Sequence, residues 1–166
     1  MLIRRLLPSD AAAYQAMRLA ALRDSPSAFA SSYEEECDTP QATIEARLAT
    51  DSGRCQFGAF DGTELAGIVG VGRDQARKGR HKAYIRAMYV APALRAKGTG
   101  RQLCAAALAF AAAMEGVRQV TLSVTAGNNA AVDLYLSMGF KICGQEPDSL
   151  LVDGVFYDDI QMVRIL

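Results

Sequence analysis

A short basic turn that contains two glycines is the segment of this sequence best suited to bind an anion. Residues 95–101 read Arg-Ala-Lys-Gly-Thr-Gly-Arg and lie between a strand-like run and a long helical pattern. The first backbone N–H groups of a helix have no partner inside the helix, and the helix dipole adds partial positive charge there. Gly98 and Gly100 have no Cβ, so a phosphate can approach the backbone closely. The turn therefore predicts a phosphate site, and the alternative is a tight basic turn that only starts a helix. Its basic residues are Arg95, Lys97 and Arg101.

The spacing of these glycines differs from two common nucleotide-binding motifs. The phosphate loop of ATPases requires GxxxxGK[ST], and dinucleotide-binding turns carry a third glycine as GxGxxG. The sequence fits neither pattern, because no glycine or second lysine follows between Gly100 and Cys104. A nucleotide-binding α/β protein of another class remains an alternative.

A second segment, residues 128–135, combines a helix cap with an aromatic hydroxyl. It reads Asn-Asn-Ala-Ala-Val-Asp-Leu-Tyr. Asparagine is among the preferred N-cap residues, so Asn128 or Asn129 can cap a helix that Gly139 closes. On that helix, Tyr135 is either a core aromatic residue or a phenol that is available for chemistry.

Both segments need strands and helices to position them, and the hydrophobic pattern predicts these in alternation. Apolar residues two apart predict strands, and apolar residues three and four apart predict helices. The predicted strands are residues 2–6, 55–60, 65–72, 83–90, 118–125 and two within 140–166 around an Asp153-Gly154 turn. The predicted helices are residues 11–23, 39–49, 99–117 and the one that begins after Asn128 or Asn129. The order β-α-α-β-β-β-α-β-α-β-β indicates an α/β fold, a sheet flanked by helices.

Length and composition limit the classes of protein that the chain can represent. Its 166 residues predict a single domain, 1–166, because domains average about 150 residues. The 18 Lys and Arg balance the 18 Asp and Glu, so neither nucleic acid nor a membrane surface is an expected partner. No run approaches the roughly 20 apolar residues of a membrane span, and residues 1–9 do not resemble a secretory signal.

The cysteines form no metal-binding or disulfide pattern. None belongs to a CxxC pair, and the only histidine, His81, is not spaced to complete a zinc site. We therefore expect free and mostly buried thiols, no metal, and the reducing cytoplasm as the location. The four residues are Cys37, Cys55, Cys104 and Cys143.

Together, the two segments resemble the GCN5-related N-acetyltransferase (GNAT) family. Residues 95–100 match that family's [QR]-x-x-G-x-[GA] turn, and Tyr-Val-Ala-Pro precedes them at residues 89–92. Residues 128–135 and the later Gly139-Phe140 are similar to its N-x-x-A-x-x-L-Y…G-F segment. The family's element order covers nearly the whole chain. Ala96 stands where many members have Gly, and alanine fits there without strain if its φ is negative.

The resemblance implies a mixed, mostly antiparallel twisted sheet, with acetyl-CoA as co-substrate and no metal. The sheet would splay between residues 83–90 and 118–125, and the cofactor would lie in that gap. Amides of the turn would hold the pyrophosphate, and the strand before it would pair with the pantetheine arm. The cofactor-binding residues implied in this way are Met88, Tyr89, Val90, Arg95, Ala96, Lys97, Gly98, Thr99, Gly100, Arg101, Asn128 and Tyr135.

The same resemblance implies direct transfer of an acetyl group to a primary amine of a small molecule, a peptide or a protein. The amide near Met88 would bond the thioester carbonyl and stabilise the oxyanion. Asn128 would contact the pantetheine arm or the neighbouring backbone, and it can also cap its helix. Tyr135 would be the catalytic residue, because a phenol with a pKa of about 10 is protonated at neutral pH and can protonate the departing thiolate.

The base that deprotonates the amine is not indicated by one motif. Several family members use a Glu on the strand before the turn, but residues 84–88 contain no acid. The alternatives are water and five acidic residues. The acidic run of residues 34–36 would also attract a cationic amine, and a solvated helix face or loop is the alternative for most of its members. The acidic candidates are Glu34, Glu35, Glu36, Asp158 and Asp159.

The type of activity and the partners leave further alternatives. A non-catalytic acyl-CoA-binding regulatory domain could have the same fold, because a fold does not determine a function. The acceptor could be a protein N-terminus, a lysine, a polyamine, an amino acid or an aminoglycoside, and acyl groups other than acetyl are open. The tail hairpin is a candidate surface for a homodimer.

Overall fold

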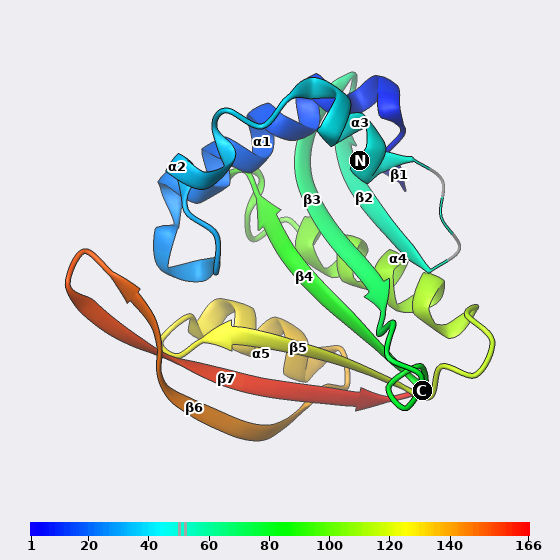
Figure 1. The fold of residues 1–166 in the computed structure, drawn as a ribbon, viewed down its shortest axis with the longest axis vertical. Coiled ribbons are helices and arrows are strands. Elements are labelled where there is room, and N and C mark those ends of the chain that lie inside the picture. Colours follow the sequence, from blue (N-terminus) through cyan, green and yellow to red (C-terminus); the bar gives the residue numbers. More distant parts are fainter. Residues whose placement is uncertain (50, 52) are drawn as a thin grey trace.

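One mixed sheet organises the chain. The computed structural model describes residues 1–49, 51 and 53–166, and within them the seven strands follow the order β1-β2-β3-β4-β5-β7-β6 (Figure 1). The strands are β1 (Leu2–Arg5), β2 (Arg54–Asp61), β3 (Glu64–Arg73), β4 (Lys82–Val90), β5 (Gln119–Thr125), β6 (Lys141–Val152) and β7 (Val155–Ile165). The helices are α1 (Ala11–Asp24), α2 (Tyr33–Glu36), α3 (Gln41–Leu48), α4 (Thr99–Ala112) and α5 (Asn129–Ser137). Short 3-10 helices occupy Pro8–Asp10, Pro26–Ala28 and Pro92–Leu94.

The predicted fold class and the order of the strands and longer helices are confirmed, and the one added α-helix is short. A capping box explains α2. The Ser32 hydroxyl accepts a hydrogen bond from the Glu35 N–H at 3.3 Å, and the Glu35 carboxylate accepts one from the Ser32 N–H at 2.7 Å. The acidic run of residues 34–36 therefore starts and ends within a single helical turn, with Glu34 and Glu35 exposed.

The helix after the basic turn is shorter than predicted. The apolar spacing predicted a helix to Val117, but α4 ends at Ala112 and Ala113 is exposed. Gly116 adopts a φ of +77° in the turns that follow, a conformation that glycine takes without steric cost. The periodicity extended too far because Met114 and Val117 pack against the core from these turns.

β4 and β5 are parallel neighbours that pair over a short distance. Their register joins Lys82 to Gln119, Ala83 to Val120 and Tyr84 to Thr121, and the other neighbouring strands are antiparallel. Beyond Tyr84 the two strands diverge, as Figure 1 shows. The predicted splay between residues 83–90 and 118–125 is thus confirmed. From Ile85 onward, the β5-facing edge of β4 has no strand partner within the described residues.

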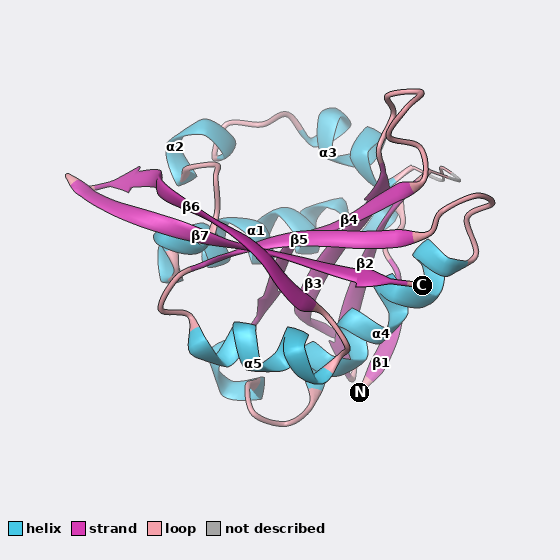
Figure 2. Cartoon of the chain, turned by 90° about the horizontal axis from the view of Figure 1, so that it is seen from below, coloured by secondary structure: helices cyan, strands magenta, loops and turns pink. Residues whose placement is uncertain are grey.

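Helices cover both faces of the sheet. α4 packs on β2, β3 and β4, whereas α1 packs on β3 and contacts α3. Figure 2 shows α4 and α5 on the opposite side of the sheet from α2 and α3. Successive side chains of β3 point to opposite faces of the sheet. Val69 therefore belongs to the core under α4, and Ile68 belongs to the core under α1. Across the described residues, every helix is too short or too polar to span a bilayer.

The cysteines are free, but only half of them are buried. Cys55 and Cys104 lie in the core, Cys37 is half-buried and Cys143 is exposed. The expectation of mostly buried thiols is therefore wrong for the last of these, which lies on the open hairpin of β6 and β7. Burial raises the pKa of the Cys104 thiol to about 11, so this group stays protonated at neutral pH.

Candidate active site

The turn between β4 and α4 presents a row of backbone N–H groups that have no partner among the described residues. The Arg95 N–H bonds to the Pro92 carbonyl at 3.2 Å, and the Gln102 N–H bonds to the Gly98 carbonyl at 3.1 Å. Between them, no backbone carbonyl of the described residues accepts a hydrogen bond from the amides of residues 96–101. Gly98 caps α4 with a φ of +81°, and a Cβ added there would meet no atom within 4 Å. These amides are free to bond an anion at the start of the helix.

Ala96 adopts the left-handed conformation, contrary to the condition under which alanine would fit without strain. Its φ is +58°. For a residue with a Cβ this conformation costs roughly 1–2 kcal/mol, because the Cβ approaches the following carbonyl oxygen. The turn therefore keeps a shape that glycine would favour and holds an alanine in it.

Close packing fixes the first turn of α4 against its neighbours. A Cβ on Gly100 would lie 3.3 Å from Leu134 Cδ2 of α5, which is tighter than ordinary contact. Thr99 is buried, and its hydroxyl donates a hydrogen bond to the Leu94 carbonyl at 3.2 Å. The start of the helix is thus held against α5 and against the preceding turn.

The basic side chains of the turn point in different directions. The Arg95 guanidinium donates to the Asp24 carboxylate at 2.5 Å and to the Val90 carbonyl at 2.9 Å, so it connects the turn to the end of α1. The hydrogen bond from Arg95 is the main reason that the pKa of Asp24 lies below its ordinary value. Arg101 donates to the Ser137 hydroxyl at 2.9 Å, whereas Lys97 is exposed. Within the turn, only Lys97 carries a charge with no protein partner among the described residues.

A bulge interrupts β4 just before the turn. Ile68 pairs with Tyr89 and Gly70 with Arg86, so Ala87 and Met88 together lie opposite one residue of β3. Ala87 has a φ of +53°, and its neighbour Met88 is turned toward α5. Bulges of this kind bend a strand and redirect its groups, and they are frequent beside active sites. The bulge lies on the part of β4 that has no pairing with β5.

Tyr135 reaches from α5 to this bulge. Its hydroxyl donates to the Met88 Sδ at 3.6 Å, and its ring packs edge-on against Phe140 at a centroid distance of 5.7 Å. Tyr135 is 7% exposed, and burial raises its pKa well above the ordinary value of a phenol. The side chain is thus a core aromatic residue that also holds a protonated hydroxyl at the gap. Among the described residues, this hydroxyl has one hydrogen-bond partner, a weakly accepting thioether.

Asn128 is confirmed as a helix cap. Its side-chain oxygen accepts a hydrogen bond from the Ala131 N–H at 3.3 Å at the start of α5, and the residue is exposed. The implied contact with a cofactor is compatible with this role, because the amide N–H₂ group of the same side chain is not needed for the cap.

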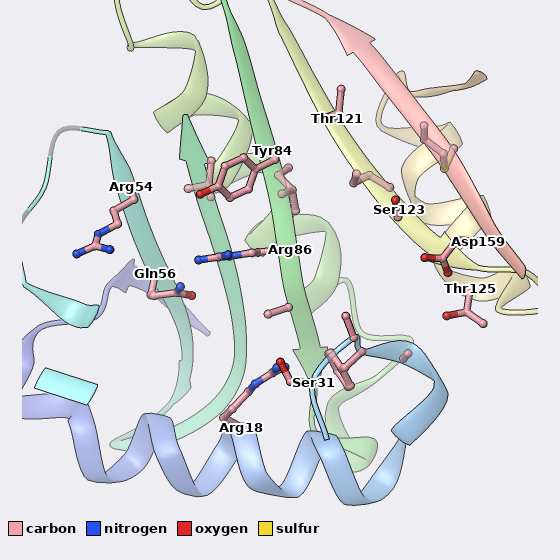
Figure 3. Close-up of a pocket in the computed structure, with 18 of the residues that line it drawn as sticks. Arg18, Ser31, Arg54, Gln56, Tyr84, Arg86, Thr121, Ser123, Thr125 and Asp159 are labelled. Atoms are coloured by element: carbon pink, nitrogen blue, oxygen red, sulfur yellow. The ribbon is translucent and has the colours of Figure 1, made fainter. Parts of the chain in front are cut away.

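A cavity of about 910 Å³ opens on the α1 side of the sheet, beside the gap (Figure 3). It is lined by side chains of β2, β4, β5 and β7, with α1 and the segment around α2 on the far side. β4 joins this cavity to the basic turn, because Arg86 and Ala87 line the cavity and Val90 precedes the turn. Polar lining residues include Arg18, Gln56, Tyr84, Arg86, Thr125 and Asp159.

The structure brings two of the five acidic candidates into this cavity. Glu36 and Asp159 line it, whereas Glu34 lines a smaller cavity and Glu35 is used in the capping box. The carboxylate of Asp158 is occupied by the Asp148 N–H at 3.0 Å and by Gln145 at 2.8 Å. The acidic run therefore contributes one side chain to the cavity, and the rim is less acidic than the sequence suggested.

Glu36 and Asp159 differ in what surrounds them. Arg18 donates two hydrogen bonds to Glu36, at 2.9 and 3.3 Å. Burial acts to raise the pKa of Glu36, but the bonds and charge of Arg18, with smaller effects of Ser31 and Arg47, together outweigh it, so the pKa is lowered. Asp159 accepts one hydrogen bond, from the Ser149 hydroxyl at 3.2 Å. Asp159 is thus the cavity acid that no arginine neutralises among the described residues.

Sequence reasoning missed the arginines of the cavity wall. Arg18, Arg54 and Arg86 come from three different elements that the chain brings to one face. Two signals were present in the sequence. Arg86 interrupts an apolar strand, and Gly70 and Gly72 alternate on β3, so they remove side chains from that same face.

Comparison with known proteins places this geometry in a family. Residues 17–140 match the Acetyltransferase (GNAT) family. A GNAT-family acetyltransferase of Streptococcus pneumoniae is similar with a TM-score of 0.89 and 26% identity, over 99% of each chain. The yncA structure of Salmonella typhimurium, solved with its cofactor acetyl-CoA, has a TM-score of 0.83 and 23% identity, over 100% of this chain and 94% of that one.

A curated relative agrees over a shorter region. An uncharacterized protein of Mycobacterium leprae is 32% identical over 111 residues, which are 65% of this chain but 28% of that protein. The chain thus matches little more than a quarter of that relative's length. The family match includes the basic turn, the bulged strand and Tyr135, and the fold agrees over the full length of solved relatives. The chain belongs to the GNAT acetyltransferase family.

Proposed function

We propose that this chain transfers the acetyl group of acetyl-CoA to a primary amine. One observation carries the proposal. The backbone N–H groups of residues 96–101 have no hydrogen-bond partner among the described residues, and they come directly after the edge of β4 that is not paired with β5. Such amides can bond a diphosphate, and an open strand edge can pair with the two amide groups of a pantetheine arm. The Salmonella relative of the same fold, solved with acetyl-CoA, supports this choice of co-substrate.

In the proposed reaction the amine in the cavity attacks the thioester carbon beside the bulge of β4. The new N–C bond forms, the C–S bond breaks, and the amide near Met88 bonds the oxyanion in between. Tyr135 gives its proton to the departing thiolate, and burial keeps that proton in place at neutral pH. Asp159 takes the proton that the amine loses, because its carboxylate lines the cavity and is not neutralised as Glu36 is.

Binding of acetyl-CoA tests the site directly. Titration calorimetry should show binding by the native chain, and Gly98→Glu should abolish it, because a side chain and a negative charge would occupy the phosphate site. Gly62→Glu is the matched control, since Gly62 also has a positive φ and open surroundings but lies in a distant hairpin. Binding by Gly98→Glu at native affinity would contradict the assignment.

Turnover separates the enzyme from the acyl-CoA-binding alternative. An amine panel with acetyl-CoA should release free CoA thiol in the presence of an accepted amine. Binding of acetyl-CoA without thiol release from any amine would favour a regulatory domain on the same fold.

The remaining expectations about the protein's setting are part of the proposal. We place it in the cytoplasm as one domain, and free thiols such as Cys143 suit a reducing compartment.

The tip of the β6–β7 hairpin exposes Leu151, Val155 and Phe156. The homodimer expected at this hairpin stays a prediction that sedimentation velocity can check.

A further inference from the structure

We propose that the acceptor carries a carboxylate beside its amine, as a free amino acid does, and that Arg86 and Arg18 bind this carboxylate. The inference rests on the proposed acetyl transfer and adds the substrate class. It starts from the distribution of charge and of unpartnered donors in the 910 Å³ cavity.

Arg86 is an exposed residue of β4 that lines the cavity. Cross-strand register places Gln56, Gly70 and Arg86 in one row over β2, β3 and β4. A Cβ on Gly70 would lie 2.9 Å from the Gln56 amide oxygen, so the missing side chain leaves room for the Gln56 side chain to lie over β3. Figure 3 shows Arg86 lying across the sheet toward Gln56. Arg86 forms no ion pair within the described residues.

Arg18 supplies a second donor that the protein itself does not use. The residue is 7% exposed and lines the cavity, and Figure 3 shows it rising from α1 toward β4. Its Nε and Nη2 bond to Glu36, whereas its buried Nη1 has no hydrogen-bond partner within the described part of the chain. Buried donors in folded proteins are nearly always paired, so this one is available to an acceptor group that enters the cavity. A carboxylate is the acceptor whose geometry suits a guanidinium best.

The charges of the cavity are unevenly placed, because four arginines and Glu36 line it together, whereas Asp159 lies apart from them. Arg47 and Arg54 also line the cavity. The Arg47 Nη1 lies 4.0 Å from the Glu36 Oε2, and the Arg54 Nε lies 3.4 Å from the Asp51 Oδ2. On the opposite wall, Asp159 lies near Thr125 on the side of β5 and β7 (Figure 3). In this arrangement the carboxylate of the acceptor lies on the arginine side of the cavity and its amine on the side of Asp159.

This division discriminates among the acceptors that the sequence left open. Polyamines and aminoglycosides carry several positive charges and no anion, so the arginine wall would repel them. A free amino acid carries one group of each sign, so it matches the two kinds of charge that line the cavity. A peptide that begins with an acidic residue would share the same carboxylate chemistry, and the experiment below separates the two.

The test measures CoA release by the full chain with four sets of acceptors: free L-amino acids, their carboxamides, spermidine, and short amidated peptides with Asp or Glu at the second position. At least one free amino acid should be acetylated with a kcat/KM ten or more times that of its carboxamide. Faster turnover of spermidine, of the carboxamides or of the peptides would overturn the inference, as would no turnover of any free amino acid.

Variants connect this preference to the arginine. Arg86→Gln should raise the KM for the preferred amino acid by roughly tenfold to a hundredfold, the loss expected for charge-assisted hydrogen bonds, and should change the carboxamide rate little. Arg77→Gln, which removes the same charge from an exposed loop outside the cavity, is the matched control. An unchanged KM in Arg86→Gln would refute the assignment. Calorimetry with acetyl-CoA on the native chain and on the same variants separates failure of this inference from failure of the proposed function. If the native chain does not bind acetyl-CoA, the acetyl transfer itself is refuted.

Discussion

In the proposed mechanism, Tyr135 serves both packing and chemistry. Its ring is part of the core against Phe140, and its hydroxyl ends at the bulge of β4, next to Met88. Burial penalises the phenolate and not the phenol, so the environment that packs the ring also keeps the proton on the oxygen. The two interpretations left open by the sequence are therefore compatible.

Tyr135→Phe should lower kcat by about a hundredfold, the lower end of the range for general acids, and leave the Kd for acetyl-CoA nearly unchanged. Because the pKa of this phenol is raised, the native rate should not fall from loss of the acid as the pH rises toward 10. Steady-state rates between pH 6 and about 10 check both points. Tyr157→Phe, a change on β7 outside the cavity, is the control, and native turnover by Tyr135→Phe would remove Tyr135 from the role of acid.

The adjacent acids Asp158 and Asp159 offer an internal comparison. Asp159→Asn should lower kcat by roughly a hundredfold or more through loss of the base. Asp158→Asn should have little effect on kcat, because the Asp158 carboxylate is already bonded to the Asp148 N–H and to Gln145, and the former is the main reason that its pKa is lowered. Equal losses in both variants would indicate a disturbed hairpin and not a base.

At the scale of elements, the start of α4 combines the proposed phosphate site with a local backbone strain. Its free amides depend on a turn in which Ala96 and Gly98 both have positive φ. Only Gly98 has a residue type suited to that conformation. The strain at Ala96 is therefore a property of the element that can be measured.

Ala96→Gly should raise the free energy of unfolding by up to about 1 kcal/mol. Relief of roughly 1–2 kcal/mol of left-handed strain exceeds the roughly 0.5–1 kcal/mol that the added freedom of glycine costs. Ala93→Gly, in the 3-10 helix just before, should destabilise by about 0.5–1 kcal/mol because no strain is relieved there. Urea denaturation gives both values, and a loss of stability in Ala96→Gly similar to that in Ala93→Gly would refute the strain.

Elements also show the limits of sequence prediction. The basic turn, the Asn128 cap and the β6–β7 hairpin were predicted because each depends on a few adjacent residues. The end of α4 was not, since Met114 and Val117 continue the apolar spacing beyond the helix. The row of Gln56, Gly70 and Arg86 was also missed, because strand register joins residues that are far apart in sequence. The direction of the Arg95 side chain likewise depends on Asp24, 71 positions away.

At the scale of the molecule, the strands β1–β4 and the strands β5–β7 form two halves of one sheet, and a short stretch of backbone pairing joins them. β4 and β5 pair only from Lys82 to Tyr84, and the candidate cofactor site lies where they part. A ligand in this gap would contact both halves, so its binding free energy adds to the stability of the folded state.

Hydrogen exchange should locate this effect. Acetyl-CoA at about 100 times its Kd should stabilise the fold by about 2.7 kcal/mol and raise the melting temperature by several degrees. Amides of residues 85–90 and 96–101 should exchange more slowly in the complex. The pairing of β1 with β2, at the far edge of the sheet, serves as the reference region, and protection confined to other segments would contradict a site in the gap.

Gly70 and Gly72 have a consequence for how selectivity could change in proteins of this kind. A methyl group at Gly72 would collide with the Tyr84 ring, just as one at Gly70 would collide with Gln56. Gln56 and Tyr84 line the cavity in which we place the acceptor, so two glycines that take no part in proton transfer fix part of its wall. Single alanine replacements there would displace these two side chains and change the shape of the wall without altering the reacting groups. Evolution or a protein engineer could use them to retune the substrate spectrum independently of the chemistry.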